Sequence, residues 1–409
     1  MKFSKLSQLF LVSMIGLTVA TLLTACAINT VDYVFVASSA GSGTGSAGQI
    51  QTYDADNTTG ALRSGAATVP SGGNNPVSIA VTGDFSNLYV VNQASNNVVH
   101  FALSGSGILT QKDVVTTSAS PVSVAVNAAQ TYLYVVSGPT PAVLTAYSLS
   151  GGVIGSIAGQ MPLALPAPYA SDTIVPSGVN VLANNNAVFV SAYDQSAYNP
   201  GCTPAPSCAG STANPGWVFG FAVGSGGALA ASADSPYKAG VKPSALISDP
   251  TNRFVYVTDF ASNELIGYTI QNGSTLDFLI NGPFKTGNEP NAIAIDPRGI
   301  YLYVTNALDS TVSSFQISLS TGTPSAAINT TGSQTNSTDT TPVAVVVDPA
   351  VGRYVYTANQ QGNSLSGFKL NPNTGALQPT ISTPYPTGFA PAAVAAVPHG
   401  NHAIQVTSP

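Results

Sequence analysis

Polar side chains able to bind a ligand or activate water recur at one position of a repeated segment. Each directly follows a short run of aromatic and β-branched residues of the kind found in strands. A carboxylate at this position could act as a general base, and an amide could hold a polar ligand. Asn and Asp also close turns with their own side chains, so turn capping is the alternative role. The four candidates are Asn92, Asp259, Asn306 and Asn359.

Two further residues belong with these candidates. Glu289 directly precedes a strand that begins with Pro, and Trp217 follows the longest interruption of the repeat. Loops that enter the Pro strands and loops that leave the aromatic strands should share one face of the molecule. We therefore predict a ligand face around a channel mouth, formed by the four candidates together with Glu289 and Trp217. The aromatic residues around the interruption are typical of a recognition loop, although it could equally be a neutral insertion.

The interruption contains two of the three cysteines, Cys202 and Cys208. If the chain is exported to an oxidising compartment, a local disulfide between them is the natural interpretation. Two thiolates without a nearby His, Asp or Glu cannot complete a tetrahedral metal shell. The sequence therefore predicts a disulfide in this loop and no metal site.

The histidines offer little acid–base chemistry. His100 lies in the middle of a predicted strand, where we expect it to be packed, and His399 and His402 lie in a C-terminal turn, where we expect them to be solvated. A hydrolase needs a base for water and a donor for the developing oxyanion. No cluster of residues meets that need, so the catalytic residues stay unassigned. A Cys-x-x-Cys-His haem motif is also missing, and we predict no cofactor.

The elements that would position the ligand face come from a repeat. A Pro followed by a short apolar run recurs seven times, at spacings of 45, 55, 67, 47, 52 and 49 residues. Repeats of this length made of strands and turns are typical of propeller blades. The chain is therefore predicted to be all-β, a seven-bladed β-propeller of four-stranded blades. The Pro positions are 76, 121, 176, 243, 290, 342 and 391.

Each repeat predicts the order of its own strands. The Pro run, rich in Ala and Val, should lie innermost, and the run with a Tyr or Phe should wedge between neighbouring blades. Asp-Pro pairs at 249, 296 and 348 should start the turn between these two strands. Residues 33–37 and 49–54 lack a Pro strand, whereas 391–397 lacks the rest of a blade. Pairing them would close the ring, although residues 402–406 compete with 33–37 for the same place.

The first residues form a targeting segment. Lys2 and Lys5 precede the apolar run 9–23, which ends in Leu-Thr-Ala-Cys26. This ending resembles the bacterial lipobox, in which the Cys is lipidated. The alternatives are an ordinary secretory signal or a transmembrane helix, for which the run is short. We predict a signal peptide over 1–25, lipidated Cys26 with a tether over 26–30, and the propeller over 31–409. The protein would then be exported and anchored by its lipid to the outer membrane or cell surface, facing the periplasm or the exterior.

Composition limits the partners. Charged residues make up 7% of the chain, against roughly 25% in average soluble domains. The formal net charge is −6, with only eleven Lys and Arg. No basic stripe exists to neutralise phosphates, so a nucleic-acid partner is excluded. A glycan or an envelope protein suits the polar, weakly charged surface better, and we predict a monomer.

The repeated strand resembles a known family. Tyr303-Val-Thr-Asn306 matches the YVTN repeat, and the order of Pro strand, Asp-Pro turn, Tyr-Val strand and Thr-Gly-Ala-Leu turn is similar to that of the seven-bladed lactonase family over residues 31–406. The resemblance implies the propeller fold. Because the family includes bacterial 6-phosphogluconolactonases, it also implies lactone hydrolysis as a candidate activity.

The residues that the resemblance would make catalytic are absent. Phosphogluconolactonase-like members share Pro-Arg-His on an inner strand, a Phe-His-Pro turn and Asn-Glu after the second strand. Here no Pro is followed by Arg-His. The residue after the strand end is never Glu, and examples at that position are Gln93, Ala307 and Gln360. We therefore favour a cell-envelope binding module. The alternative is an exported lactonase that uses a carboxylate at the channel mouth, such as Asp259 or Glu289.

Overall fold

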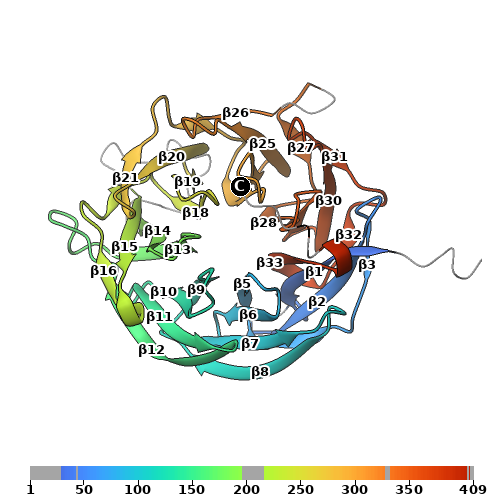
Figure 1. Ribbon diagram of the computed structural model, residues 1–409, viewed down its shortest axis with the longest axis horizontal. Coiled ribbons are helices and arrows are strands. Elements are labelled where there is room, and N and C mark those ends of the chain that lie inside the picture. The colour runs from blue at the N-terminus through green and yellow to red at the C-terminus, as the bar shows by residue number, and fades with distance from the viewer. Residues whose placement is uncertain (1–28, 43–44, 196–215, 328–331, 403–404, 406–409) are drawn as a thin grey trace, which may run out of the picture.

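Seven antiparallel sheets radiate from a central channel and form a closed ring (Figure 1). This computed structural model describes residues 29–42, 45–195, 216–327, 332–402 and 405. The predicted seven-bladed, all-β propeller is confirmed, because helix is confined in the described chain to two short 3-10 turns, η1 (Ser225–Gly227) and η2 (Gly400–His402). In these same residues we find no helix long and apolar enough to cross a bilayer.

Each blade has four main strands, and its Pro strand lies innermost as predicted. From inner to outer strand, the blades are as follows: blade 1, β5 (Pro76–Val81), β6 (Asn87–Asn92), β7 (Asn97–Leu103) and β8 (Leu109–Thr116); blade 2, β9 (Pro121–Val126), β10 (Tyr132–Ser137), β11 (Val143–Ser150) and β12 (Val153–Pro162); blade 3, β13 (Ile174–Val181), β14 (Ala187–Asp194), β15 (Trp217–Val223) and β16 (Leu229–Ala231); blade 4, β18 (Pro243–Ser248), β19 (Phe254–Asp259), β20 (Glu264–Gln271) and β21 (Thr275–Phe278); blade 5, β23 (Pro290–Ile295), β24 (Tyr301–Asn306), β25 (Thr311–Ile317) and β26 (Pro324–Ala326); blade 6, β28 (Pro342–Val347), β29 (Tyr354–Asn359), β30 (Ser364–Leu370) and β31 (Leu377–Pro379); blade 7, β33 (Phe389–Pro398), β1 (Thr30–Ser39), β2 (Ala47–Asp56) and β3 (Leu62–Ser64).

Five short strands extend the outer halves of these sheets. Each pairs with a third strand of its blade, on the stretch that the fourth strand leaves open. They are β4 (Val69–Asn74) on β2, β17 (Tyr237–Lys238) on β15, β22 (Phe284–Lys285) on β20, β27 (Thr335–Ser337) on β25 and β32 (Tyr385–Pro386) on β30. These pairings shorten the exposed sheet edges at the rim of the ring.

Apolar contacts between blades form the core. In the part of the chain that the structure describes, seven buried clusters are found, and each joins side chains of two adjacent blades. Val90 of blade 1, for example, packs with Phe35 of blade 7, and both side chains are fully buried. A blade therefore has no core of its own and depends on its neighbours, as expected for a repeat architecture.

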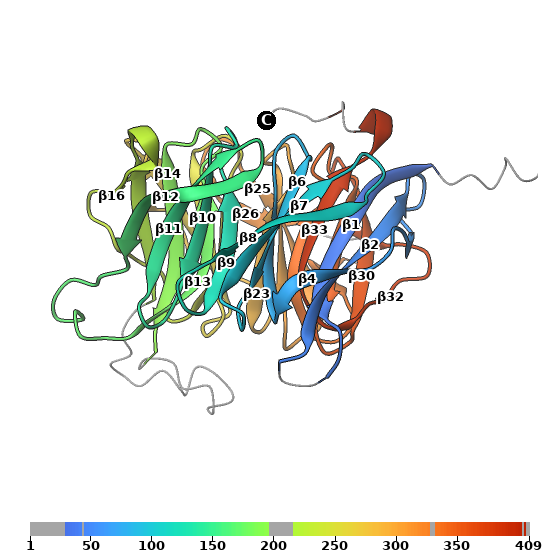
Figure 2. The same ribbon diagram turned by 90° about the horizontal axis from the view of Figure 1, so that it is seen from below.

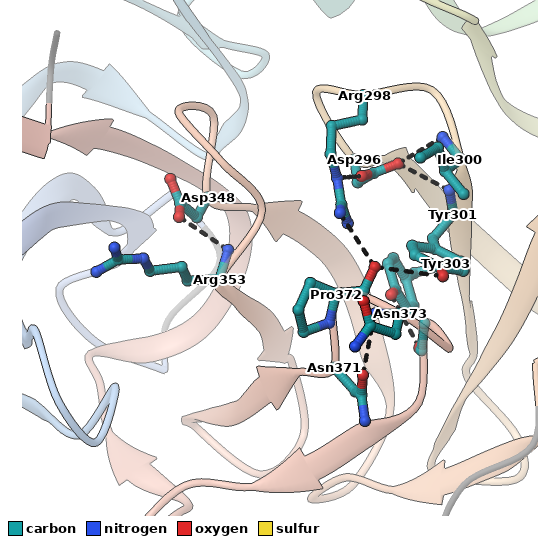
Figure 3. Close-up of polar contacts among 11 residues, drawn as sticks. Asp296, Arg298, Ile300, Tyr301, Tyr303, Asp348, Arg353, Asn371, Pro372 and Asn373 are labelled. Carbon is teal, nitrogen blue, oxygen red and sulfur yellow. Dashed lines mark hydrogen bonds and ion pairs between the residues drawn. The ribbon is translucent and has the colours of Figure 1, made fainter. Parts of the chain in front are cut away.

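Tyrosine hydroxyls fasten neighbouring blades together. In blades 1, 4, 5 and 6, the Tyr of the second strand is fully buried and donates a hydrogen bond to a glycine carbonyl in the turn between the third and fourth strands of the next blade. Figure 3 shows Tyr303 within such a contact region, between blades 5 and 6. The sequence predicted the wedging aromatic but not its polar partner. The pairs are Tyr89 and Gly152, Tyr256 and Gly322, Tyr303 and Gly375, and Tyr356 and Gly60.

The Asp-Pro turns between the first and second strands are capped as predicted. One oxygen of Asp296 accepts hydrogen bonds from the backbone N–H groups of Ile300 and Tyr301, both at 2.7 Å (Figure 3). Its other oxygen accepts from Nε of Arg298, and Arg298 also reaches the carbonyl of Pro372 in blade 6. The Asp side chain thus satisfies backbone donors that the turn leaves without partners.

The two ends of the chain close the ring. β1 pairs on one side with β2 and on the other with β33, so that Val34 lies opposite both Tyr53 and Ala396. The predicted closure is confirmed, and β1 occupies the place for which residues 402–406 competed. His402 instead belongs to η2, which lies just beyond the end of β33 at one face of the ring (Figure 2).

Candidate functional site

The inner strands of all seven blades line a central channel of about 400 Å³. Such a volume is typical of sites for small molecules. Its lining side chains are small and apolar, interspersed with uncharged polar ones. Among the described residues that line it, none carries a charge, so the channel wall can hold polar groups but offers no acid or base. The polar members are Ser78, Ser123, Ser177, Ser244, Asn291 and Gln360.

Charged groups that could act on a channel ligand belong to the loops at its mouth. We call the side with the loops that enter the first strands and leave the second strands the loop face. The opposite side, with the turns between first and second and between third and fourth strands, is the turn face. Lys242 and Glu289 directly precede Pro243 and Pro290, where two neighbouring inner strands begin. The loop face therefore places a cation and a carboxylate directly before the inner strands of two adjacent blades.

The Lys242 ammonium lies in an aromatic environment. Its Nζ is 3.9 Å from the centroid of the Phe260 ring and 5.6 Å from that of Tyr193. Both distances fall within the range of cation–π attraction. Burial lowers the pKa of Lys242 to about 8, although the negative charges of Glu289 and Asp259 oppose that shift. An amine with a pKa near neutrality can change its charge under mild conditions, which is a property of functional lysines.

Glu289 is held by its backbone, and its side chain is half-buried. Its N–H donates to Oδ1 of Asn263 at 2.8 Å, and its carbonyl accepts from the N–H of Ala307 at 2.8 Å. The residue adopts a φ of 55°, a left-handed conformation that costs energy for a residue with a side chain. The carboxylate is thus carried on a fixed backbone, as a positioned general base would be.

The three strand-end amides lie inside the fold. Asn92, Asn306 and Asn359 are fully buried. The amide nitrogen of Asn306 donates to hydroxyls of Thr311 and Ser313, both at 2.9 Å, while its oxygen accepts from the N–H of Gly287. Asn92 bonds with Ser71 and Asn97, and Asn359 with Ser364 and Ser366. These amides fasten loops to strands, which is the capping role weighed as the alternative.

Asp259 has the same capping role, with a carboxylate in place of the amide. It is fully buried and accepts hydrogen bonds from the N–H groups of Val241 at 2.8 Å, Lys242 at 2.9 Å and Ala261 at 3.1 Å. These bonds hold the loop that carries Lys242. Asp259 therefore positions the lysine, whereas Glu289 is the carboxylate of the predicted ligand face that is open to solvent.

Trp217 is also buried and does not present an aromatic surface. It begins β15, packs edge-on against Tyr169 at 5.5 Å between ring centroids, and belongs to the core between blades 2 and 3. Its Nε1 has no hydrogen-bond partner among the described atoms. The residue was predicted to lie at the ligand face because it follows the long interruption. That prediction is wrong, because its ring is buried in the apolar interface between blades 2 and 3.

Several predictions on cysteine and histidine have different outcomes. Cys26, Cys202 and Cys208 lie outside the described residues. His100 is packed as expected, stacked on Tyr89 and 2.6 Å from Asp113. The prediction that His402 is solvated is wrong, because it is buried against Asp348 at 3.0 Å. Sequence position near a chain end gave no sign of that carboxylate partner.

Lys242 lies in a loop that enters an inner strand, and therefore on the loop face, but it was not among the six residues of the predicted ligand face. The signal was present, since a Lys directly before an inner strand is one of only eleven basic residues in the chain. Taken together, a carboxylate and a partly desolvated ammonium beside an uncharged polar channel could activate water and stabilise an oxyanion.

Comparison with known proteins agrees with this architecture. The family model "Lactonase, 7-bladed beta-propeller" matches residues 2–126 and 229–401. That is more than half of the chain, and the protein therefore belongs to the seven-bladed β-propeller lactonase family. Among functionally curated proteins, no sequence matches.

Solved structures share the fold at low sequence identity. A candidate 6-phosphogluconolactonase of Bacteroides uniformis is 18% identical, with a TM-score of 0.71, over 90% of this chain and all of its own. The similar protein of Bacteroides fragilis has 18% identity and a TM-score of 0.67, over 90% and 98%. The periplasmic gluconolactonase PpgL of Pseudomonas aeruginosa has 17% identity and a TM-score of 0.69, over 90% and 99%.

Proposed function

We propose that this protein is a lactone hydrolase that works at the loop-face mouth of its channel. Membership of the lactonase family supports this activity over the binding module that we favoured from sequence. The observation that carries it is the position of Lys242, with a pKa of about 8, and of Glu289, each directly before one of two neighbouring inner strands. Asp259, our other candidate base, is engaged by three backbone donors.

In the proposed reaction, the Glu289 carboxylate takes a proton from water as the water oxygen attacks the lactone carbonyl carbon. The Lys242 ammonium stabilises the oxyanion that forms, because a cation in a partly desolvated site acts strongly on developing charge. When the intermediate collapses, the ring C–O bond breaks and the leaving oxygen takes the proton from Glu289. The products are the open-chain hydroxy acid and the regenerated side chains.

The substrate class follows from the channel lining. A phosphorylated lactone needs several cations, best supplied by Arg, and the described channel lining has none. Serine hydroxyls and the amides of Asn291 and Gln360 suit the hydroxyls of a sugar instead. We therefore propose an unphosphorylated sugar lactone as substrate.

Turnover of a lactone panel by the purified protein tests the activity. The panel contains glucono-δ-lactone, 6-phosphogluconolactone and aliphatic lactones, and the change in pH from released acid is followed. We expect hydrolysis well above buffer for the sugar lactone, and Glu289→Gln should lower kcat about 10²-fold or more because the base is lost. The matched control is Glu264→Gln, since that glutamate, at the start of β20, forms an ion pair with Lys285 of β22.

Two results would contradict the proposal. Folded wild-type protein without turnover would return the function to binding of glycans or envelope proteins. Turnover that survives in Glu289→Gln but falls in Glu264→Gln would move the base elsewhere.

We also propose that the protein is exported and lipidated at Cys26, which would bring it to lactones outside the cytosol. The motif Leu-Thr-Ala-Cys at 23–26 supports this. Membrane fractionation of cells grown with a labelled fatty acid should show label on wild-type protein and none on Cys26→Ser. Equal labelling of the two would overturn the lipid anchor.

A further inference from the structure

Three titratable side chains from distant parts of the chain meet beside the ring closure, on the turn face. Asp32 lies in β1, Asp348 in the turn between β28 and β29, and His402 at the end of η2. All three are buried, and each offers one ligand atom such that these atoms lie within 4.8 Å of one another. They play no part in the proposed lactone chemistry.

The imidazole lies between the two carboxylates. Nε2 of His402 is 3.0 Å from each oxygen of Asp348 and 3.7 Å from Oδ1 of Asp32. Nδ1 of His402 is 3.0 Å from Oε1 of Gln405. In a tetrahedral site with metal–ligand bonds of about 2.05 Å, the ligand atoms lie about 3.3 Å apart. The distances from Nε2 of His402 to Asp348, 3.0 Å, and to Asp32, 3.7 Å, lie on either side of that value.

Asp32 is the unusual member. Both of its oxygens are buried, and neither has a hydrogen-bond partner among the described residues. Burial, and next the charge of Asp348, raise the pKa of this carboxyl well above its ordinary value. A buried carboxylate without donors is costly unless a cation or proton satisfies it. Arg353 does not do so, since its guanidinium bonds to Oδ1 of Asn57.

The corresponding turns of other blades need no such partner. Asp296 is satisfied by two backbone donors and by Arg298 (Figure 3). Asp348 likewise accepts hydrogen bonds from backbone N–H groups, those of Ala350 and Arg353, but its side-chain partner is His402 and not an arginine. The second carboxylate and the imidazole are thus additions to a turn that is already capped.

A cavity of about 380 Å³ opens next to these groups. Its lining includes His402, His399, Asn57, Asn401 and Gln405. The space and the polar lining allow water to complete a coordination shell, and they provide a path for an ion to enter.

From this geometry we propose that Asp32, Asp348 and His402 bind a divalent transition-metal ion of the Zn²⁺ or Mn²⁺ type. Imidazole with carboxylate oxygens is a donor set that such ions accept. The ion would displace the proton from Nε2 of His402 and neutralise Asp32. It would also link both ends of the chain to blade 6, and so strengthen the ring at its closure. This inference is independent of the proposed lactonase activity.

No metal site was predicted from the sequence, where the two loop cysteines lacked further ligands and positions 32, 348 and 402 lie far apart in the chain. Only the pairing of β1 with β33 and the contact of blades 6 and 7 bring them together.

Metal binding by the purified, untagged protein is the test. Chelated and dialysed protein is titrated with ZnCl₂ or MnCl₂ by calorimetry, and thermal unfolding is followed with and without the metal. We expect one ion per chain and a rise in Tm on the order of 3–5 °C at saturating metal. With Co²⁺ as a probe, d–d absorption bands should report imidazole and carboxylate ligation.

Variants separate this site from incidental binding. Asp32→Asn and His402→Gln should each abolish stoichiometric binding, the Tm response and the Co²⁺ bands. Asp32→Asn is expected to fold, because it removes an unsatisfied buried charge. His399→Ala is the control, since it lies in the same cavity but outside the triad. Absence of stoichiometric binding in the wild type, or binding that survives both triad variants, would overturn the proposal and leave the triad as a protonated internal ion pair.

Discussion

Nζ of Lys242 lies 3.9 Å from the centre of the Phe260 ring, and Phe260 directly follows the strand-end residue Asp259. One loop therefore supplies both the aromatic face that desolvates the ammonium and the carboxylate that holds the lysine backbone. This arrangement explains how Lys242 has a pKa of about 8 although the negative charge of the nearby Asp259 opposes that lowering. The predictions below test this loop and the contacts that keep the blades in place.

The activity should decline at alkaline pH. If the charged form of Lys242 stabilises the oxyanion, kcat/KM falls as pH rises through about 8, because the ammonium then loses its proton. Lys242→Arg should keep its activity above that pH, since a guanidinium stays charged. Lys242→Met should lose about 10²-fold relative to wild type below pH 8, and the difference should narrow at higher pH. The measurement is the pH profile of lactone hydrolysis for all three proteins. An identical alkaline decline in Lys242→Arg would remove Lys242 from the chemistry.

Stability should change with pH in the opposite sense. The pKa of Lys242 is lowered to about 8 in the fold, against about 10.4 in an unfolded chain. Between these values the unfolded chain binds more protons, so the free energy of unfolding rises with pH. Denaturant titrations at pH 7 and pH 10 should show this rise for wild type relative to Lys242→Met. A difference that is the same at both pH values would show that the pKa is not lowered.

Asp259→Asn should affect stability more than chemistry. The change keeps one acceptor oxygen but weakens the bonds from Val241, Lys242 and Ala261. We expect a loss of about 1–3 kcal/mol in the free energy of unfolding, with a fall in turnover that is smaller than that of Glu289→Gln. Urea unfolding and lactone hydrolysis measured together check this. Loss of turnover at full stability would instead make Asp259 a catalytic carboxylate.

Removing one tyrosine hydroxyl should weaken the contact between two blades. Tyr303→Phe deletes the hydrogen bond to the Gly375 carbonyl, at a cost of about 1–2 kcal/mol. Tyr134→Phe is the matched control, because the Tyr134 hydroxyl is buried without a partner among the described residues. That variant should be neutral or slightly more stable. Equal losses in both would mean that the hydroxyl contact contributes nothing specific.

A turn glycine that faces a tyrosine ring of the neighbouring blade should not tolerate a side chain. Gly375 has a φ of 71°, and a Cβ there would clash with the Tyr301 ring. Gly375→Ala should cost about 2–4 kcal/mol, from backbone strain and overpacking together. Gly273, with a φ of 81° and open space around it, should cost only about 1 kcal/mol as alanine. Thermal unfolding of both variants compares the two, and similar shifts would show that the ring contact is unimportant.

The repeat in the sequence was sufficient to predict the number of blades, the order of strands and the closure of the ring. Those features depend on local chemistry: alternating side chains, Pro at the start of inner strands, and Asp-Pro or Thr-Gly turns. Each copy carries the same signals, so agreement among copies compensates for weak ones such as the third, which begins at Pro176.

The roles of the polar residues were decided by tertiary structure. Asn92 and Asp259 stand at positions where capping and ligand contact require the same residue types, and only burial with named donors separates the two. Trp217 and His402 were wrongly predicted to be exposed, because their burial depends on residues of other blades that are distant in the sequence.

Lys242 and Asp32 show the physical basis of that difference. A strand forms from the residues within it, so its pattern is written in a few neighbouring positions. A pKa or an unsatisfied carboxylate depends on desolvation and on charges within a few ångströms, which here come from residues such as Glu289, Asp348 and His402. Packing of blades 4 and 5 brings Glu289 near Lys242, and closure of the ring brings Asp348 and His402 near Asp32. No local pattern in the sequence records either contact.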